Sequence, residues 1–357
     1  MGRLLDHKSC SGCMACYSVC PVKCISVVQD ADGFYLPQID QKSCINCSKC
    51  EKACAKANGK GDYVPMFGKA FSTKDEKTLA RSSSGGVFTA LAAGVLAEGG
   101  VVYGAGYDEA FQVRHIRVDA EEDLRKLNGS KYVQSHIGDS LISAKEDLKA
   151  GRKVLFSGTP CQVAGLIACL PEKYRENLLA VDFICHGVPT PKAWEAYLGH
   201  MQTSVGKVQS VNMRDHRLGQ DNYGMCIAGE KDTYFQSCGQ DPYLVAFNHN
   251  LTLRSSCFQC KHKKITCQSD ITMGDLWGGK AWISPERYTG HHSLVIANSP
   301  KGAQCIKNLD RYGSVDPIPL AQALRVNAAR FYPSGKIHKK TTAEVVKELA
   351  DGTFTSK

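Results

Sequence analysis

Near its start the chain carries two cysteine-rich segments, CSGCMACYSVCP at residues 10–21 and CINCSKCEKAC at residues 44–54. Each places four cysteines in the order C-x2-C-x2-C-x3-C. Two residues between successive cysteines allow a tight turn to point three thiolates at one small metal cluster. The fourth ligand lies on the far side of the cluster and must come from the other half of a pseudo-symmetric fold. The two segments therefore predict a duplicated metal-binding domain.

This spacing is typical of a bacterial two-cluster ferredoxin, in which three cysteines of one run and the fourth of the other hold each 4Fe–4S cluster. We therefore assign Cys10, Cys13, Cys16 and Cys54 to one cluster, and Cys44, Cys47, Cys50 and Cys20 to the other. Zinc also binds C-x2-C pairs, but a zinc site has no use for eight thiolates in duplicate runs. Disulfides fit less well still, because no signal peptide is visible and the spacing suits metal.

Length and composition indicate two or three domains and no membrane span. The chain has 357 residues, against ~100–200 for a typical domain, and its hydrophobic content of 43% allows a proper core. No apolar run reaches the ~20 residues needed to cross a bilayer. With 18 cysteines, the protein fits the reducing cytoplasm.

The formal net charge of +9 is spread along the chain. A solvated basic surface accounts for it, and the functional alternative is docking of an acidic ferredoxin or an anionic substrate. Nucleic acid is not expected as a partner, because the charge is not concentrated and no basic motif with interleaved aromatic residues occurs. The oligomeric state is not readable from the sequence, which leaves a homo-oligomer open.

The sequence divides into a ferredoxin-like domain, a linker, a main domain and a tail. Their predicted boundaries are 1–62, 63–78, 79–324 and 325–357, in that order. The linker is assigned because residues 55–74 are polar and glycine-rich. The tail is basic and ends in a helix with the capping box Thr341-x-x-Glu344.

The main domain alternates between helix and strand patterns. Strand patterns at 101–103, 153–157 and 178–184 are separated by helix patterns at 140–150 and 161–170. Interleaving at this spacing predicts an α/β domain with a mixed, partly parallel sheet. The predicted fold class is therefore α+β for the chain as a whole, with a two-cluster ferredoxin domain followed by an α/β domain.

A second set of cysteines lies in the main domain. Cys161 and Cys185 each follow a predicted strand, and Cys257 and Cys260 form a further C-x2-C pair. Because strand ends converge at one edge of an α/β sheet, these four thiolates can meet around a third cluster. The alternatives are buried structural cysteines and, for the pair, a zinc site.

Two polar loops are candidate phosphate sites. Residues 82–86, SSSGG, precede a helix, whose first backbone amides and dipole suit a pyrophosphate. Residues 129–135, GSKYVQS, add a cation, hydroxyls and an aromatic ring. Each loop alone is ambiguous, because serine and glycine before a helix are more often simple caps.

From about Leu79 to Gly302 the chain resembles the family of beta subunits of the coenzyme F-420 (deazaflavin) hydrogenases and dehydrogenases. The resemblance rests on several motifs in order: SSGGVF at 83–88, GGVVYG at 99–104, SKYVQS at 130–135, GTPCQ at 158–162, DFICHG at 182–187, the Cys257/Cys260 pair, SDITMGD at 269–275 and WG at 277–278.

The resemblance implies an FAD bound in the main domain, with a 4Fe–4S cluster beside it on Cys161, Cys185, Cys257 and Cys260. The flavin-binding residues predicted on this basis are Ser83, Ser84, Gly85, Gly86, Ser130, Lys131, Tyr132, Ser135, Gly158, Thr159 and Asp275. The sequence departs from the family pattern at Thr266-Cys267-Gln268, where an arginine is usual. Cys267 is therefore a spare thiol or an alternative ligand, and Cys260 is the least secure of the four.

Three clusters beside one flavin suggest an electron path that ends in hydride chemistry, since a flavin accepts single electrons and releases two together. We expect electrons to pass from ferredoxin or a partner subunit through the clusters to FAD, and then as hydride to deazaflavin or another small organic molecule, or the reverse. His186 is the candidate proton donor, with a purely structural histidine as the alternative.

The alternative hypothesis gives the chain no substrate of its own. It is then a non-catalytic electron-transfer beta subunit of a hydrogenase or formate dehydrogenase complex. The basic tail and the lack of an evident proton-transfer pair favour this alternative, whereas the ferredoxin module on the same chain argues for a stand-alone enzyme.

Overall fold

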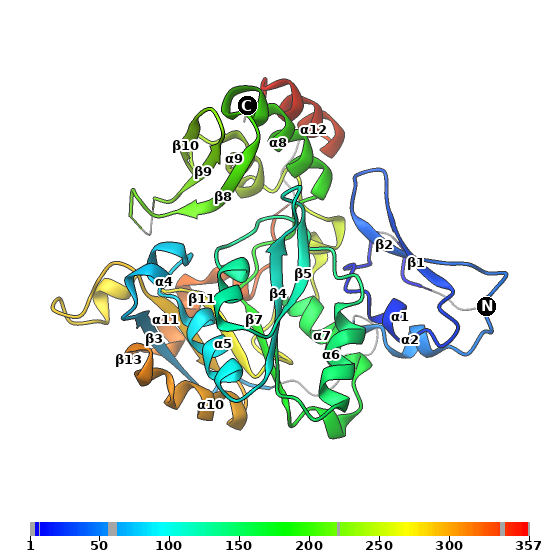
Figure 1. Cartoon of the computed structure of the whole chain (residues 1–357), viewed down its shortest axis with the longest axis horizontal. Helices are drawn as coiled ribbons and strands as arrows, with labels where there is room; N and C mark the ends of the chain where they lie inside the picture. The colour runs from blue at the N-terminus through cyan, green and yellow to red at the C-terminus, as the bar shows by residue number, and fades with distance from the viewer. Residues whose placement is uncertain (1–3, 7, 56–62, 220–221, 336–339, 356–357) are drawn as a thin grey trace.

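The computed structural model describes residues 4–6, 8–55, 63–219, 222–335 and 340–355. They form three parts: an N-terminal module, a large α/β core and a smaller cap (Figure 1). None of the helices described is long and apolar enough to cross a membrane.

The N-terminal module repeats one backbone arrangement twice. Each cysteine run contains a one-turn helix, α1 (Ala15–Ser18) within the first and α2 (Lys49–Lys52) within the second. The residues before these helices, Met14 and Ser48, both have positive φ angles, 60° and 56°. A hairpin of β1 (Ile25–Gln29) and β2 (Tyr35–Ile39) separates the two runs. The duplication expected from the cysteine spacing is therefore present in the backbone.

The core is built on an eight-stranded sheet in the order β13-β3-β12-β11-β7-β6-β4-β5. Strands β4, β6, β7 and β11 pair in parallel and the outer strands antiparallel, which confirms the predicted mixed sheet. The bounds are β3 Phe67–Thr73, β4 Val101–Tyr107, β5 Val113–Val118, β6 Val154–Gly158, β7 Leu178–Phe183, β11 Ile271–Asp275, β12 Ser293–Ala297 and β13 Gly313–Pro317.

Helices cover both faces of this sheet, so its central strands are buried throughout. These helices are α4 Glu76–Arg81, α5 Val87–Ala97, α6 Ser140–Lys149, α7 Pro160–Cys169, α10 Pro300–Lys307 and α11 Leu320–Val326. Short 3-10 turns lie at Glu121–Leu127, Glu172–Tyr174, Ser255–Gln259, Gly279–Ala281, Leu309–Arg311 and Ala328–Arg330.

The predicted linker is in part a strand. Residues 67–73 form β3, which lies inside the core sheet between β12 and β13. Within its sequence FGKAFST, Ala70 and Phe71 are fully buried. The glycine and lysine of this strand, Gly68 and Lys69, come directly before the buried pair, so the main domain begins earlier than residue 79.

The cap has its own sheet and its own core. Strands β8 (Val208–Asp215), β9 (Gly224–Gly229) and β10 (Thr233–Ser237) pair antiparallel in the order β10-β9-β8. The cap helices are α8 Pro191–Val205, α9 Pro242–Asn248 and α12 Thr342–Asp351, which begins with the predicted capping box and ends at Gly352. Side chains such as Trp194, Tyr197 and Tyr243 fill the space between helices and sheet. The predicted main domain therefore contains two packed units.

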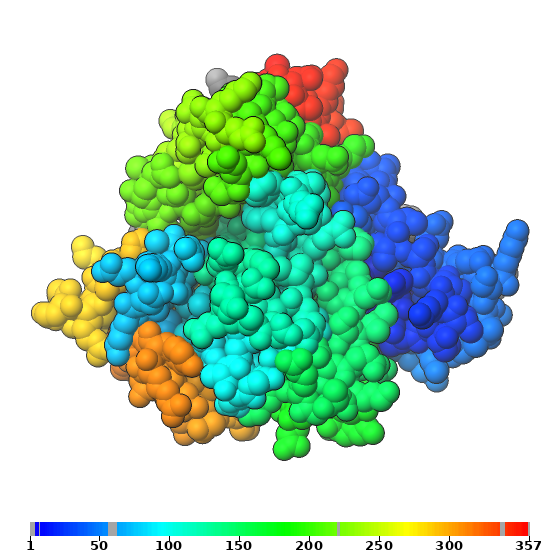
Figure 2. Space-filling model, in the orientation of Figure 1, coloured from blue at the N-terminus to red at the C-terminus, as the bar shows by residue number. Residues whose placement is uncertain are grey.

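The N-terminal module packs on the core beside α6 and α7 (Figures 1 and 2). The approach is close at Gly165 of α7, where an added Cβ would lie 2.9 Å from Cys13 Cβ and 3.0 Å from its Sγ. Such a distance leaves no space for a side chain. A glycine inside this helix thus sets how closely the first cysteine run approaches the core.

Alanine in place of a helical glycine favours the helix but adds a methyl group that can clash. Replacing Gly165 and, as a control, Gly199 separates these two effects. Gly199→Ala on α8, where nothing lies within 4 Å, should raise the free energy of unfolding by up to about 1 kcal/mol through helix propensity. Gly165→Ala should lower it instead, because the added methyl group meets Cys13. Thermal unfolding and limited proteolysis of the module measure both variants, and equal stabilisation by the two would contradict the close packing.

Candidate functional site

The first predicted ligand set gathers at the face of the module that meets the core. Burial raises the pKa of Cys16 to about 12, with further contributions from the neighbouring thiols of Cys10, Cys54 and Cys50. Burial also raises the pKa of Cys13, which lies near Cys16, Cys10 and, across the interface, Cys161. A ligand from the second run, Cys54, thus lies beside the first run, as the crossed assignment requires. The ligand assignment itself stays a prediction.

The second predicted set, Cys20, Cys44, Cys47 and Cys50, lines one small cavity of about 20 Å³. Cys24 lines the same cavity, with its Sγ 3.5 Å from that of Cys20. This buried thiol was not among the predicted ligands, although its position four residues after Cys20 was a signal for it. Among the residues that the structure describes, no three His, Cys, Asp or Glu side chains are grouped to hold a single metal ion.

The third predicted set comes together from three chain segments. Cys161 lies in the first turn of α7, directly after β6, and its Sγ is 3.0 Å from Thr159 Oγ1. Cys185 follows β7, and Cys257 and Cys260 lie on and just after the 3-10 turn Ser255–Gln259. Burial raises the pKa of Cys161 to about 12, and both Cys260 and Cys257 add to that effect. Burial likewise raises the pKa of Cys185, and the neighbouring thiol of Cys257 raises it further.

Cys267, the proposed alternative ligand, lies apart from this set. It is buried, and its Sγ donates to the carbonyl of Ser269 at 3.7 Å. Its thiol faces Asp182 and Arg330, whereas Cys260 acts on both Cys161 and Cys185. The geometry therefore favours Cys260 over Cys267 as the fourth member.

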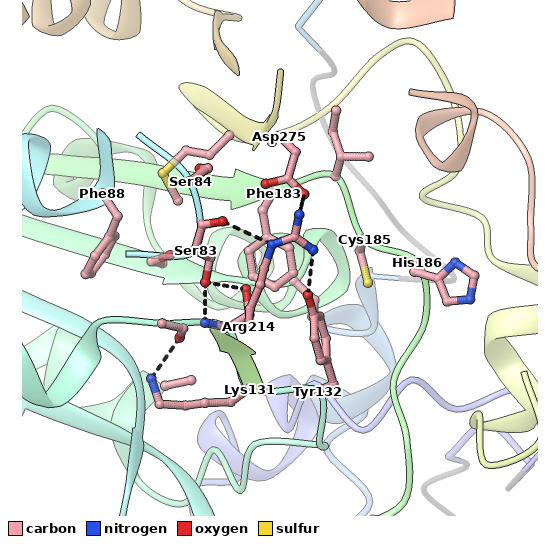
Figure 3. A pocket seen from close by; sticks show the side chains of 18 of the residues that line it. Ser83, Ser84, Phe88, Lys131, Tyr132, Phe183, Cys185, His186, Arg214 and Asp275 are labelled. Atoms are coloured by element: carbon pink, nitrogen blue, oxygen red, sulfur yellow. Dashed lines mark hydrogen bonds and ion pairs between the residues drawn. The ribbon is translucent and has the colours of Figure 1, made fainter. Parts of the chain in front are cut away.

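A cavity of about 590 Å³ opens beside the third cysteine set, between the core and the cap (Figure 3). The carboxyl ends of β6, β7 and β11 and the first turn of α5 form its walls. Of the predicted flavin and catalytic residues, those that line it are Ser83, Ser84, Gly86, Ser130, Lys131, Tyr132, Ser135, Gly158, Thr159, His186 and Asp275. Cys185 lines it as well.

Gly85 is the one predicted flavin residue outside the lining. An added Cβ there would lie 2.0 Å from the carbonyl oxygen of Phe71 and 2.6 Å from the amide of Ser293. This glycine therefore lets the loop before α5 pack directly on the edge of the sheet. Its role in the fold is to position its neighbours, Ser84 and Gly86, at the cavity.

Hydrogen bonds join the two polar loops at the N-terminus of α5. The Ser83 hydroxyl accepts from the backbone amide of Ser130 at 2.6 Å and from its hydroxyl at 2.8 Å. Ser84 and Ser293 hydroxyls lie 2.8 Å apart. Because these hydroxyls hold the loops together, residues nearly fifty positions apart form one rim of the cavity (Figure 3).

The ammonium group of Lys131 is engaged by backbone oxygens. Its Nζ donates to the carbonyls of Leu127, Asn128 and Gly129 at 3.3, 2.8 and 3.0 Å. Burial lowers its pKa to about 7. In this arrangement Lys131 closes the 3-10 turn before the loop, and its predicted contact with flavin phosphates requires the ammonium to turn toward the cavity.

Arg214, at the end of β8, places a buried positive charge in the cavity and was not predicted. It is 4% exposed and forms an ion pair of 2.9 Å with Asp275. Its Nε donates to the Ser83 carbonyl at 3.0 Å and its Nη1 to the Tyr132 hydroxyl at 3.2 Å. The guanidinium also lies over the ring of Tyr223, 4.1 Å from its centroid. Figure 3 shows it between the two polar loops and Asp275.

His115 is a second buried residue of the cavity that sequence reasoning missed. Its Nε2 lies 3.0 Å from the Ser157 carbonyl and its Nδ1 2.7 Å from the Ser135 hydroxyl. Since a carbonyl only accepts, Nε2 carries the proton and Nδ1 accepts from Ser135. Burial lowers its pKa to about 4, so the ring is neutral at pH 7.

His186, the predicted proton donor, lies beyond Cys185 on the side away from Arg214 (Figure 3). Its Nε2 lies 2.6 Å from Asn250 Oδ1, and its ring meets the edge of Phe247. Burial lowers its pKa. Lys263 bonds the carbonyls of both Cys185 and His186, which fixes the strand end that carries them.

These features define the chain as an iron–sulfur protein whose α/β core holds a deep cavity beside a third cysteine set. Comparison with known families agrees. The family described as "4Fe-4S dicluster domain" matches residues 9–58. Those described as "Coenzyme F420 hydrogenase/dehydrogenase, beta subunit", N-terminal and C-terminal parts, match residues 70–142 and 151–321. The chain belongs to this family of oxidoreductase beta subunits.

Two individual relatives are distant. A subunit of the F(420)H(2) dehydrogenase of Methanosarcina mazei is 22% identical over 230 residues, which are 60% of this chain and 62% of that protein. The chain therefore matches less than two thirds of that relative's length. A chain of the F420-reducing [NiFe] hydrogenase complex from Methanosarcina barkeri has 18% identity and a TM-score of 0.51, over 82% of this chain and 90% of its own. The latter likeness shows a shared fold.

His115 should make the protein sensitive to acid. Its pKa in the folded state lies below the ordinary 6.5, so the unfolded chain takes up the proton first as the pH falls. Stability is then lost between about pH 6.5 and pH 4, by up to about 3 kcal/mol. His115→Gln should reduce the drop in melting temperature between pH 7.5 and pH 5, measured anaerobically. The control is His249→Gln, at an exposed position, and equal drops in both variants would contradict the assignment.

Proposed function

We propose that this protein is an iron–sulfur flavoprotein oxidoreductase, which exchanges electrons with a redox protein at its N-terminal module and hydride with a small organic molecule at its cavity. The proposal rests on one observation: the predicted thiol sets follow one another from the N-terminal module to the wall of the cavity. The first set faces the core, where Cys13 lies near Cys161, and the third set ends at Cys185 on the cavity wall. We place the protein in the cytoplasm, as its cysteine content predicts.

Two features of the cavity lining support the proposal of a bound FAD. Its polar rim combines the Ser83 and Ser84 hydroxyls with the first amides of α5, a setting suited to a pyrophosphate. Apolar walls include Phe88, Phe183 and Trp277, which suit a flat aromatic ring. When bound, a flavin exchanges single electrons with a cluster and a hydride with a substrate.

The remaining residues of the cavity have electrostatic roles. Arg214, held in place by Asp275 and Ser83, provides a fixed positive charge that stabilises the negative charge of a reduced ring system. His186 stays the candidate proton donor, with Asn250 orienting its ring. Neutral His115 supports Ser135 at the cavity wall without adding charge.

A second candidate function also fits: an electron-transfer beta subunit without a substrate of its own. The names of the two relatives support it, since one is a dehydrogenase subunit and the other belongs to a hydrogenase complex. The two functions differ in whether the isolated chain turns over a substrate, with deazaflavin as the first compound to test.

The third thiol set should be essential for electron delivery to the cavity. Cys161→Ser should remove about four irons per chain and abolish reduction of FAD by the N-terminal clusters, while free dithionite still reduces the flavin. Cys305→Ser on α10 is the control, because Cys305 belongs to none of the three sets. Full iron content in Cys161→Ser, or an equal loss in the control, would contradict the third cluster.

The module offers a docking surface near the second thiol set. Val22 and Ile45 are 42% and 59% exposed there, and Cys47 is exposed. A crevice of about 520 Å³ adjoins Cys20, and its cationic residues come from both sides, Lys49 and Lys52 from the module and Lys145 and Arg175 from the core. None of the described residues that line it is acidic. An apolar centre with basic neighbours suits an acidic ferredoxin.

Charge reversal tests this surface. Lys52→Glu/Lys145→Glu should slow reduction of the clusters by a reduced acidic ferredoxin by about tenfold or more at low salt, with a smaller loss at high salt. Lys307→Glu/Lys347→Glu changes the net charge equally, at exposed positions on α10 and α12. Stopped-flow absorbance measures both pairs, and the same rate for the two would place docking elsewhere.

A further inference from the structure

Arg254 connects the third thiol set to the N-terminal module. Its backbone amide donates to the Val188 carbonyl at 2.9 Å, and its carbonyl accepts from the amide of Cys257 at 2.9 Å. The side chain then leaves the core and enters the module. There its Nη1 donates to the Cys10 carbonyl at 3.1 Å and its Nη2 to the Tyr35 carbonyl at 2.9 Å.

A glycine of the first cysteine run, Gly12, leaves the space that this guanidinium occupies. An added Cβ at Gly12 would lie 3.0 Å from Arg254 Nη2 and 2.8 Å from the Tyr35 carbonyl. On another side, the guanidinium lies over the ring of Phe34, 4.7 Å from its centroid. The turn that carries Cys10 and Cys13 therefore wraps closely around the arginine.

The charge of Arg254 is buried without a carboxylate partner. The residue is 3% exposed, and the described part of the chain contains no carboxylate within ion-pair distance of it. Its Nε has no hydrogen-bond partner among the described atoms. A buried charge that is not compensated strongly destabilises a fold. Negative charge must therefore come from another group.

The thiols around Arg254 supply such a group. Burial lowers the pKa of Arg254, and the groups that oppose this effect are first Cys10, then Cys257 and Cys161, with Asp30 behind them. Cys10 belongs to the first predicted cluster and the other two cysteines to the third. A cluster held by four thiolates is anionic, and reduction adds a further negative charge.

We propose that Arg254 is the shared counter-ion of the first and third clusters, where one buried guanidinium raises the reduction potential of both. Placed between them, it favours an electron on either cluster, because its positive charge stabilises the negative charge that reduction adds. It is a positioning and tuning residue rather than a catalytic one. The proposal rests on the third cluster of the proposed function and does not depend on the flavin.

Redox titration followed by EPR tests the proposal on the anaerobic holoprotein. Arg254→Gln should weaken the electron affinity of the first and third clusters about tenfold each, which is about 59 mV for one electron. The potential of the second cluster should stay unchanged and acts as an internal reference. Arg254→Lys, which keeps the charge but loses the forked geometry, should shift both potentials in the same direction by less. Arg117→Gln, at an arginine already paired with Asp147 and Asp119, should shift none.

Iron and sulfide contents distinguish a shift of the potentials from a loss of clusters. If Arg254→Gln loses clusters, the proposal is tested by Arg254→Lys, in which the reduction potentials of the first and third clusters should both shift by the smaller amount. Unchanged potentials at full iron content, a shift in one cluster alone, or an equal shift in all three would overturn the shared role. A wild-type protein with about eight irons would instead show that the third cluster of the proposed function is absent.

Discussion

The structure depends on the contact between the first cysteine run and helix α7. Gly165 removes the side chain that would keep Cys13 away, and α7 begins immediately after β6 with Cys161 in its first turn. One helix thus presents its side to the module and its start to the third thiol set. Because the carboxyl ends of β6 and β7 lie next to each other in the sheet, Cys185 joins the same set. The rest of the proposed electron path follows from this contact.

The two buried arginines along that path, Arg214 and Arg254, have different partners. In the cavity, Arg214 has a carboxylate partner, Asp275, which holds the guanidinium in place. Between the thiol sets, Arg254 donates hydrogen bonds to two carbonyls and lies over an aromatic ring, and no carboxylate among the described residues pairs with it. The first arrangement is suited to binding and orienting a cofactor. The second is suited to a site where the negative charge comes from the clusters and changes with their oxidation state.

The sequence was sufficient for features that depend on local spacing. The cysteine runs predicted the duplicated module, the alternation after residue 79 predicted the mixed sheet, and Thr341-x-x-Glu344 predicted the start of α12. The motifs SSGGVF and SKYVQS were expected at one site, and their loops meet there through Ser83 and Ser130.

Features that depend on long-range packing were not predictable. Strand β3 pairs with partners more than 200 residues away, so its polar and glycine-rich sequence resembled a linker. Arg214 and Arg254 reach their sites from segments with no motif of their own. The sequence around Lys131 likewise does not predict that its ammonium group bonds three carbonyls. The separate core of the cap likewise forms from α8, α9 and α12, which are distant in sequence.

The central claim is that one chain holds three clusters in line with a flavin. The most direct test is anaerobic analysis of the purified protein for iron, acid-labile sulfide and released flavin, combined with a titration by a one-electron reductant. The account predicts about twelve irons and one FAD per chain, with the flavin reduced through the clusters. About eight irons and no flavin would contradict it, and would leave a two-cluster electron carrier attached to an α/β domain without redox function.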